Sequence, residues 1–256
     1  MIDNFDLKQI VYPLQTWFQS NARVLPWREN PIAYYVWISE IMLQQTRVEA
    51  VKPYFDRFIR ELPDVKALAE CPEDKLPKLW EGLGYYNRVR NLKIAANQIL
   101  EEYAGVIPSE YEELIKLKGI GSYTAGAIAS IAYGIPVPAV DGNVLRVISR
   151  ITENREDIMK QSVRKQMEQE LACVMPKDRA GDFNQALMEL GAVVCVPNGP
   201  AKCEICPASL YCRARKNGTV SELPVKAPKK ERTVEKRTVL LIQDGKPLQV
   251  LQFRRL

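Results

Sequence analysis

The chain has 256 residues, of which 46% are hydrophobic, and a net charge of +5, so it can bury a substantial core in one or two domains. It contains no histidine, which excludes imidazole metal sites and histidine acid–base catalysis and leaves Asp, Glu, Tyr, Cys and Lys as possible catalytic acids. Because no stretch approaches the roughly 20 apolar residues of a membrane span and the N-terminus lacks a signal-peptide pattern, we expect a cytoplasmic protein whose six cysteines do not form disulfides.

The positive charge is concentrated near the C-terminus. Residues 200–256 hold 13 lysines and arginines against 5 acidic residues, whereas the rest of the chain holds 23 against 26. Such a segment indicates an anionic partner, because lysine and arginine neutralise phosphates when a protein binds nucleic acid. A solvated basic face accounts for the charge equally well.

The first half of the chain reads as short helices with recognisable starts. The pair Asn30–Pro31 predicts an N-cap and first turn, opening a helix that runs to Gln45. Thr46 and Glu49 match a capping box for the next helix. Pro53 lies inside that helical pattern, so we expect the helix to kink or restart there.

Helical patterns continue to about residue 194. Apolar residues at helical spacing, closed by Gly105, are Val89, Leu92, Ala96, Ile99 and Tyr103. Ser109 and Glu112 match a second capping box. The small residues between Tyr123 and Tyr133 predict a helix that a neighbouring backbone can approach closely, and further helices are expected over Val163–Val174 and Phe183–Val194. The fold class predicted up to this point is all-α.

The character of the sequence changes after Cys212. Residues 217–236 are rich in Pro, Lys and Glu and read as a linker. Alternating apolar residues on either side of Gly245 predict a β-hairpin. Two strands alone are marginally stable, so we interpret residues 237–256 as the incomplete start of a β-containing domain.

Four cysteines carry the sharpest chemical signal. Cys195, Cys203, Cys206 and Cys212 are spaced Cys-x7-Cys-x2-Cys-x5-Cys. Four clustered thiolates suit a tetrahedral zinc ion or a 4Fe–4S cluster. Zinc ribbons usually have two Cys-x2-Cys pairs, and this segment has one, which favours the cluster.

A second motif lies between two predicted helices. Gly119 and Gly121 flank one apolar residue, which makes a tight turn that can expose backbone N–H groups to a phosphate. This pattern matches a helix–hairpin–helix, a DNA-binding element that does not read sequence. A Gly-x-Gly between helices is, by itself, usually only a turn.

Two carboxylates are candidates for acid–base chemistry. Asp141 is expected to cap the helix that runs through Ile151. Glu40 lies between Trp37 and Ile41, an apolar setting that favours its protonated form. The non-catalytic alternatives are that Asp141 is only a helix cap and that Glu40 is only a solvated charge. The spacing in the sequence does not show that the two residues meet.

At this point the chain resembles a known family. The segments LPWR, SEIMLQQT, GLGYYNR, GIGSYTAGAI, VDGNV, FNQALMELGA and the cysteine cluster together resemble the adenine DNA glycosylases of the MutY type, within the helix–hairpin–helix superfamily that includes endonuclease III. The resemblance covers roughly residues 5 to 224. It implies excision of adenine paired with 8-oxoguanine or guanine in double-stranded DNA, a 4Fe–4S cluster, and a monomeric, nucleoid-associated enzyme.

The resemblance also implies a domain organisation. Residues 28–134 would form a six-helix barrel domain that carries the helix–hairpin–helix, and residues 1–27 and 135–216 would form an iron–sulfur cluster domain. The hairpin at 237–256 would open a C-terminal domain similar to the MutT hydrolases.

Each residue that matches a motif takes an implied role. Glu40 is implied as the general acid that protonates adenine at ring nitrogen 7, and Asp141 as the carboxylate that stabilises the oxocarbenium-like sugar. Tyr123 and Asn143 are implied to position these two groups. The family lines its adenine pocket at Arg23, Trp27 and Gln185. Gln45, Leu83, Gly84 and Tyr85 fall where the family enters the base stack around the oxidised guanine. Gln44, Thr46 and the hairpin glycines Gly119 and Gly121 are implied as further DNA-binding residues.

Three features qualify the resemblance. Endonuclease III-like enzymes carry a lysine at position 123 that forms a Schiff base and cleaves the strand, so Tyr123 predicts a monofunctional glycosylase. The first cysteine gap is seven residues, where the family pattern has six. The short C-terminal segment leaves open how strongly 8-oxoguanine is discriminated from guanine.

Two other functions remain open from the residues. One is a thymine- or uracil-directed mismatch glycosylase of the same superfamily, and the other is a non-catalytic iron–sulfur module that binds DNA. A catalytic pair requires pKa values pushed apart. We therefore expect burial to raise the pKa of Glu40, and the N-terminus of its helix to keep Asp141 ionised.

Overall fold

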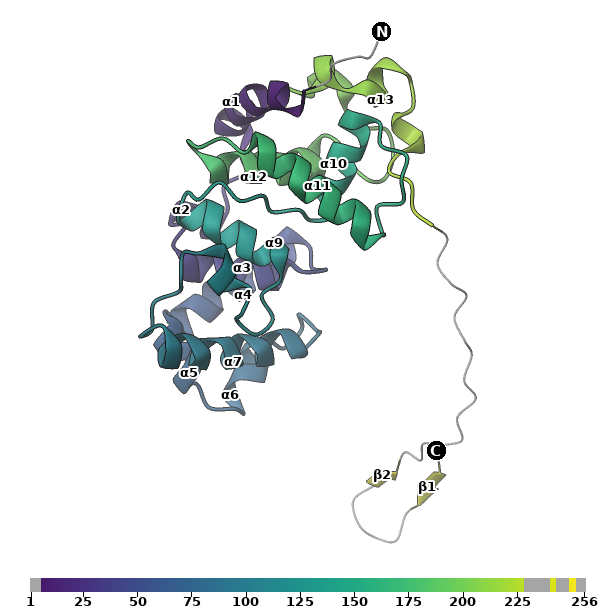
Figure 1. The fold of residues 1–256 in the computed structure, drawn as a ribbon. Helices are drawn as coiled ribbons and strands as arrows, with labels where there is room; N and C mark the ends of the chain where they lie inside the picture. The colour runs from purple at the N-terminus through teal and green to yellow at the C-terminus, as the bar shows by residue number, and fades with distance from the viewer. Residues whose placement is uncertain (1–5, 228–239, 243–248, 252–256) are drawn as a thin grey trace. The chain divides into compact units, whose positions relative to one another are not determined.

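The computed structural model describes residues 6–227, 240–242 and 249–251, and divides into the units Met1–Lys226 and Ala227–Leu256 (Figure 1). In the second unit, β1 (Leu240–Ile242) pairs antiparallel with β2 (Gln249–Leu251), which confirms the predicted hairpin. The other residues of the predicted MutT-like segment at 237–256 lie outside the described residues.

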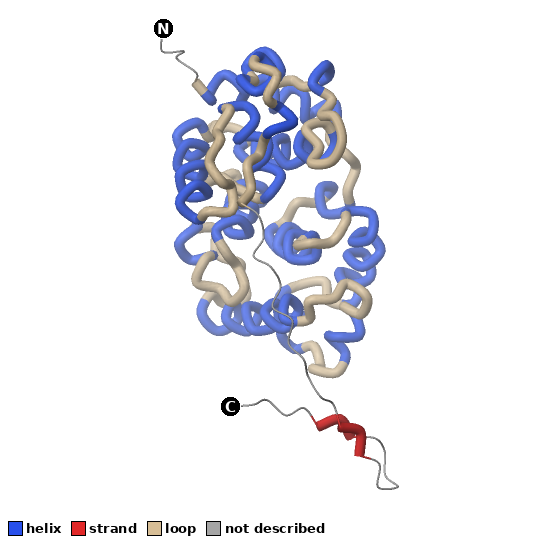
Figure 2. Tube along the Cα trace, turned by 90° about the vertical axis from the view of Figure 1, so that its right-hand side faces the viewer, coloured by secondary structure: helices blue, strands red, loops and turns tan. Residues whose placement is uncertain are grey.

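The first unit is helical, as Figure 2 shows in blue, which confirms the all-α prediction. Its longer helices are α1 (Val11–Asn21), α3 (Ala33–Leu43), α4 (Val48–Glu61), α7 (Asn87–Glu102), α10 (Gly142–Thr152), α11 (Gln161–Val174) and α12 (Ala180–Val193). Shorter α-helices are α2 (Pro26–Glu29), α5 (Val65–Glu70), α6 (Lys75–Leu79), α8 (Tyr111–Leu114), α9 (Ser122–Ala127) and α13 (Arg213–Lys216). The 3-10 turns are η1 (Leu7–Ile10), η3 (Cys203–Ile205), η4 (Ser209–Tyr211) and η5 (Val220–Glu222), and η2 (Ile128–Ala132) is a π-helical continuation of α9. Within the described residues, none of these helices is long and apolar enough to cross a membrane.

The apolar residues of this unit form two hydrophobic cores. One core is built by the helices from α2 to α9, between Leu25 and Ala139. The other joins η1 and α1 to α10, α11 and α12, so the beginning of the chain packs with its later helices. Figure 1 shows this return, with purple α1 beside green α12. The division into the two predicted domains stays a prediction.

Three glycines allow segments of the chain to approach closely, and the contact at Gly181 joins helices of the two cores. A Cβ atom added to Gly126 of α9 would lie 2.2 Å from the carbonyl oxygen of Pro138. One added to Gly181 would lie 2.7 Å from the carbonyl oxygen of Ser130, and one added to Gly191 would lie 2.6 Å from Cβ of Asn143. The close approach predicted for the small-residue segment therefore exists at Gly126.

In the first core the helix start expected at Asn30 is wrong, and the restart that was one alternative at Pro53 does not occur. α3 begins at Ala33, and Asn30 lies at the end of α2, where its carbonyl accepts a hydrogen bond from the Ile32 N–H. α4 runs without a restart through Pro53. The burial of Val51, Phe55 and Phe58 on this helix offsets the hydrogen bond that the proline cannot donate.

Both predicted capping boxes are also wrong. Gln45 adopts a left-handed conformation at φ 60° that turns the chain, and the Thr46 hydroxyl donates to the carbonyl oxygen of Gln44 instead of capping α4. The Ser109 hydroxyl donates to the carboxylate of Glu110. In each case a local turn supplies another acceptor for the hydroxyl.

The predicted linker begins too early. The carbonyl oxygen of Leu223 accepts a hydrogen bond from Arg150 Nε at 2.9 Å, and that of Val225 accepts one from the Ile158 N–H at 3.1 Å. Leu223 is buried. Residues 217–226 therefore belong to the helical unit. The rest of the expected linker, from residue 228 to residue 236, lies outside the described residues.

Candidate active site

A pocket of about 560 Å³ collects side chains from both hydrophobic cores. It brings together ten of the residues singled out in the sequence, namely Arg23, Trp27, Glu40, Gln44, Gln45, Thr46, Tyr123, Asp141, Asn143 and Gln185. The pocket therefore contains both candidate carboxylates, which are 101 positions apart in the chain.

Glu40 is a carboxylate placed in the core by its helix. α3 is buried along most of its length, from Tyr34 to Met42, because it is apolar on nearly every face. Burial raises the pKa of Glu40 to about 7, and the nearby charge of Asp141 adds to the rise. The hydroxyl of Tyr123 donates a hydrogen bond to Glu40 Oε2, which opposes the rise but does not cancel it. Glu40 can therefore hold a proton near neutral pH, as the sequence predicts.

Tyr123 lies in the first turn of α9, with its hydroxyl between Glu40 and the sulfur of Met188. Burial, together with the charges of Glu40 and Asp141, raises its pKa well above the usual value of 10.0. The phenol therefore stays protonated and acts as a hydrogen-bond donor to Glu40. This bond occupies Oε2 and leaves Oε1 as the oxygen that can carry a transferable proton.

Asp141 is the N-cap of α10, as expected. Its Oδ1 accepts a hydrogen bond from the Val144 N–H at 2.8 Å, and its Oδ2 accepts one from Asn143 Nδ2 at 2.8 Å. Burial raises the pKa of Asp141, and these hydrogen bonds and the charge of Arg146 oppose the rise. The expectation that the two pKa values move in opposite directions is therefore wrong, because burial of Asp141 outweighs the effect of the helix N-terminus.

Asn143 connects Asp141 to the segment that begins the cysteine cluster. Its Oδ1 accepts a hydrogen bond from Arg146 Nη2 at 2.9 Å. Arg146 in turn donates to the carbonyl oxygens of Cys195 at 2.9 Å and Gly191 at 2.8 Å. The amide that holds Asp141 is thereby fixed from its other side.

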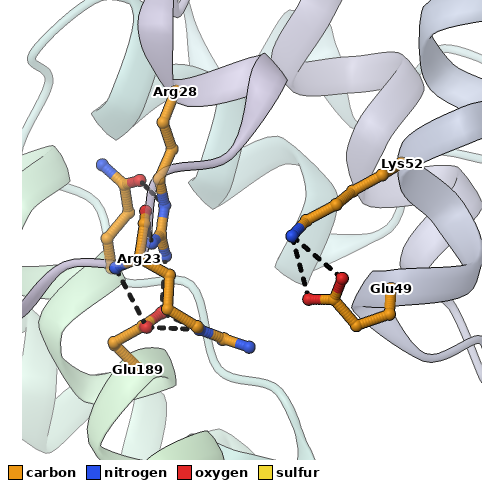
Figure 3. A network of polar contacts seen from close by, with 6 residues as sticks. Arg23, Arg28, Glu49, Lys52 and Glu189 are labelled. Atoms are coloured by element: carbon orange, nitrogen blue, oxygen red, sulfur yellow. Dashed lines mark hydrogen bonds and ion pairs between the residues drawn. The ribbon is translucent and has the colours of Figure 1, made fainter.

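An ion-pair network that the sequence did not predict forms one wall of the pocket (Figure 3). Glu189 is fully buried, and its carboxylate accepts hydrogen bonds from Arg23 and, at 2.9 Å, from Arg28. Burial raises its pKa, but the two arginines outweigh that effect and lower it. Arg28 Nε also donates to Gln185 Oε1 at 2.9 Å and so orients that amide.

Part of this network could have been found in the sequence. Gln185 and Glu189 are four residues apart and therefore share one face of α12. By contrast, the second ion pair in Figure 3 joins Glu49 and Lys52 within α4, and the glutamate is largely exposed. Exposed pairs of this kind contribute little to stability.

The remaining predicted DNA contacts lie outside the main pocket. Tyr85 is 62% exposed and shares a smaller cavity of about 290 Å³ with Gln44 and Gln45, whereas Leu83 is buried. Gly119, at φ 81°, forms the predicted turn between α8 and α9. With Gln44 it lines a third cavity, which is small.

The four clustered cysteines line one apolar cavity together with Val147, Ile151 and Leu190. Arg150 Nη1 lies 3.3 Å from Cys195 Sγ, and the Cys212 thiol lies 3.5 Å from the Arg150 carbonyl oxygen. In the part of the chain that the structure describes, no three Cys, Asp or Glu side chains converge closely enough to ligate a single metal ion.

The chain is similar to known DNA repair proteins. Residues 38–173 match the family model described as HhH-GPD superfamily base excision DNA repair protein. The adenine DNA glycosylase of Buchnera aphidicola subsp. Acyrthosiphon pisum is 39% identical over 215 residues, covering 84% of this chain and 61% of that protein. This chain thus spans about three fifths of the length of that relative.

Solved structures are also similar. A thermostable thymine-DNA glycosylase has a TM-score of 0.74 at 29% identity, covering 82% of this chain and 96% of the other. Endonuclease III, trapped as a covalent intermediate with DNA, has a TM-score of 0.68 at 26% identity, covering 82% and 97%.

Proposed function

Because the chain belongs to the HhH-GPD superfamily of base excision DNA repair proteins and has the helix–hairpin–helix glycosylase fold predicted for it, we propose that it is a monofunctional adenine DNA glycosylase. Its substrate would be adenine mispaired with 8-oxoguanine or guanine in duplex DNA. The observation that carries this proposal is the buried Glu40, bonded to Tyr123 and sharing one pocket with Asp141. The name of the Buchnera aphidicola relative supports adenine as the base.

The reaction begins with a flipped nucleotide. An enzyme cannot reach the glycosidic bond of a stacked base, so adenine must rotate out of the duplex into the pocket. Trp27, which is 6% exposed, offers an apolar surface on the pocket lining, and the amide of Gln185 is oriented by Arg28. An amide side chain can pair with the hydrogen-bonding edge of adenine.

Glu40 then acts as the general acid. Adenine leaves poorly as an anion, so protonation of its ring nitrogen 7 by Glu40 lowers the barrier to breaking the bond between C1′ and N9. The electron pair of that bond moves to the base, which departs as neutral adenine. Tyr123 keeps Glu40 oriented and remains protonated itself.

Asp141 stabilises the sugar that is left behind. As the glycosidic bond breaks, positive charge develops over C1′ and the ring oxygen, and a carboxylate beside it lowers the energy of that state. Water adds to C1′ and loses a proton to complete hydrolysis. The hydrogen bonds from Val144 and Asn143 favour the ionised form of Asp141 and fix its position.

The first test is an excision assay on a panel of duplexes. We expect adenine to be excised opposite 8-oxoguanine and guanine, and strands to break only after alkali. Because position 123 is a tyrosine and offers no amine, borohydride should trap little covalent enzyme–DNA complex. Efficient trapping that survives replacement of the other candidate lysines would contradict the monofunctional reaction.

The panel also contains the main alternative. The similarity to a thymine-DNA glycosylase structure favours thymine opposite guanine as a second candidate substrate. If thymine were excised from that duplex and adenine stayed intact in all the others, the substrate base would be thymine rather than adenine. Binding without excision of any base would indicate the non-catalytic module.

We propose that the four cysteines hold a 4Fe–4S cluster. In such a cluster each cysteine binds a different iron, so the thiols surround a common space without converging on one point. A single zinc ion needs four ligands converging on it. The four cysteines line one common cavity, which is the arrangement that a cluster needs, and their spacing has the single Cys-x2-Cys pair that favours it. When bound, the cluster would cross-link the four cysteines of the Cys195–Cys212 segment and so contribute to the stability of the folded protein.

Metal analysis checks this proposal. Anaerobically purified protein should be yellow-brown and contain about four irons per chain, together with sulfide. Cys203→Ser should lose iron, whereas Cys173→Ser, at an exposed cysteine outside the cluster, should keep it. One zinc per chain without iron or sulfide would contradict the cluster.

A further inference from the structure

Arg88 lies in the first turn of α7 with its guanidinium among main-chain carbonyl oxygens. The oxygens contacted by Nη1 are those of Ile41 at 2.9 Å, Met42 at 3.1 Å and Gln44 at 2.6 Å, and those contacted by Nη2 are those of Leu83 at 3.0 Å and Gly84 at 3.3 Å. One side chain therefore connects two segments that are about forty residues apart in the sequence.

The first of these segments is the end of α3, the helix that carries Glu40. The last carbonyl groups of a helix have no donors within the helix. Arg88 supplies donors to them, and its positive charge suits a helix C-terminus. It thereby fixes the point at which the chain leaves α3 and enters the pocket lining at Gln44 and Gln45.

Both segments contain unusual backbone conformations. Gln45 has φ 60° and Tyr85 has φ 49°, the left-handed region that residues with a side chain seldom adopt. Such conformations persist when the surrounding structure determines them. In this fold the hydrogen bonds from Arg88 to Gln44 and Gly84 hold the residue just before each of them.

Arg88 also contacts two aromatic rings. Its Cζ lies 5.4 Å from the centroid of Trp80, which is fully buried, and 5.4 Å from that of Tyr85, which is 62% exposed. The indole N–H of Trp80 donates to the Gly84 carbonyl oxygen at 3.0 Å. Arg88 thus ties the exposed ring of Tyr85 to a rigid part of the core.

We propose that Arg88 is a positioning residue that holds the segments Gln44–Thr46 and Leu83–Tyr85 in one arrangement against the base opposite the excised adenine, and so determines which mispair is accepted. The inference rests on the proposed glycosylase function. An exposed aromatic ring beside an exposed amide, at Tyr85 and Gln45, is suited to entering a base stack.

The geometry requires arginine rather than any cation. A planar guanidinium presents five donors in a fixed fork, whereas a lysine ammonium is a compact charge with three. Among the residues that the structure describes, Arg88 Nε is the one buried side-chain nitrogen or oxygen without a hydrogen-bond partner. Arg88 therefore leaves its Nε–H without a partner while both terminal nitrogens contact main-chain carbonyl oxygens.

The test compares Arg88→Lys with Arg57→Lys. Arg57 is a matched control, because its Cζ lies 4.7 Å from the Tyr54 ring and its Nη2 donates to the Leu79 carbonyl oxygen, whereas it donates no hydrogen bond to either segment. For each protein we would measure single-turnover excision of adenine opposite 8-oxoguanine and opposite guanine, affinity for undamaged duplex, and thermal unfolding. Fluorescence of 2-aminopurine placed beside the 8-oxoguanine reports whether the stack is opened.

Arg88→Lys should slow excision opposite 8-oxoguanine by about 10- to 100-fold, because the two segments lose their common anchor. The preference for 8-oxoguanine over guanine and the rise in fluorescence should both diminish, while affinity for undamaged duplex stays unchanged. Arg57→Lys should keep the parent preference and fluorescence even where its unfolding temperature falls equally.

Parent-like preference and fluorescence in Arg88→Lys would overturn the inference. If that variant does not fold, Arg88→Gln, whose amide can reach one segment at a time, replaces it. Failure of both to fold, with Arg57→Lys folded, would also overturn it, since the role would then be structural. A parent protein that excises no adenine contradicts the proposed function instead, and the fluorescence alone then decides the role of Arg88.

Discussion

Replacing Glu40 with glutamine is expected to lower the single-turnover rate of adenine excision by about 10²- to 10⁴-fold, the usual contribution of a positioned general acid. Glutamine fills the same space and can still accept the hydrogen bond from Tyr123, but it has no proton to give to the adenine ring. DNA affinity should be nearly unchanged, because Glu40 is buried in the pocket and 6% exposed.

The pH dependence gives a second measure of the same residue. The pKa of Glu40 is raised to about 7, so the carboxyl is mostly protonated below that pH and loses its proton as the pH rises through it. Excision by the parent protein should therefore fall above about pH 7, and this fall should be missing from the residual activity of Glu40→Gln.

Glu49→Gln is the matched control for Glu40→Gln. It makes the same chemical change on the neighbouring helix, at a largely exposed glutamate paired with Lys52. It should leave both the rate and the pH profile unchanged. A Glu40→Gln protein that excises adenine at a rate close to that of the parent would remove Glu40 from the role of acid.

Asp141→Asn is expected to cost about 10²- to 10³-fold in the excision rate, comparable to the loss of one electrostatic contact to a transition state. The substitution removes the negative charge that faces the sugar. It should preserve the fold, because asparagine is as good an N-cap as aspartate and its Oδ1 can still accept from the Val144 N–H.

The chain supplies a closely matched control for this variant. Asp64 caps α5 in the same way, with its Oδ1 accepting a hydrogen bond from the Ala67 N–H at 2.8 Å, and it is exposed and outside the pocket. Asp64→Asn should excise adenine like the parent. If instead both variants lost thermal stability and activity in parallel, Asp141 would be acting as a helix cap only.

Local signals predicted the helical character of the chain and the helix cap at Asp141. The Asp141 cap and the apolar stripe of α7 follow from residues within one or two turns of each other, so a single sequence contains them. The apolar neighbours of Glu40 likewise predicted its raised pKa. The raised pKa of Asp141 was missed because burial depends on helices that pack from other parts of the chain.

The charged residues that pair over long distances could not be predicted in this way. In a sequence, Glu189 and Arg88 look like the solvated charges that most such residues are. The arginine partners of Glu189 are more than 150 positions away, and the carbonyl groups that Arg88 contacts at the end of α3 are more than 40 positions away, so only the fold brings them together. The failed capping box at Thr46 has the same origin, since the carbonyl group just before Gln45 is held by Arg88 of α7.

The close contacts at Gly126, Gly181 and Gly191 bear on whether the protein or the DNA would deform during the proposed reaction. At Gly181 the backbone of α12 meets the backbone of η2 without an intervening side chain that could rotate, so helices of the two cores are held at a fixed, close spacing. A cleft of fixed width cannot widen to admit a stacked base pair. In the proposed reaction the work of deformation would therefore fall on the DNA, where a base already weakened by mispairing opens at the lowest cost. Under the proposed function, rigidity of the protein would in this way be a source of its selectivity.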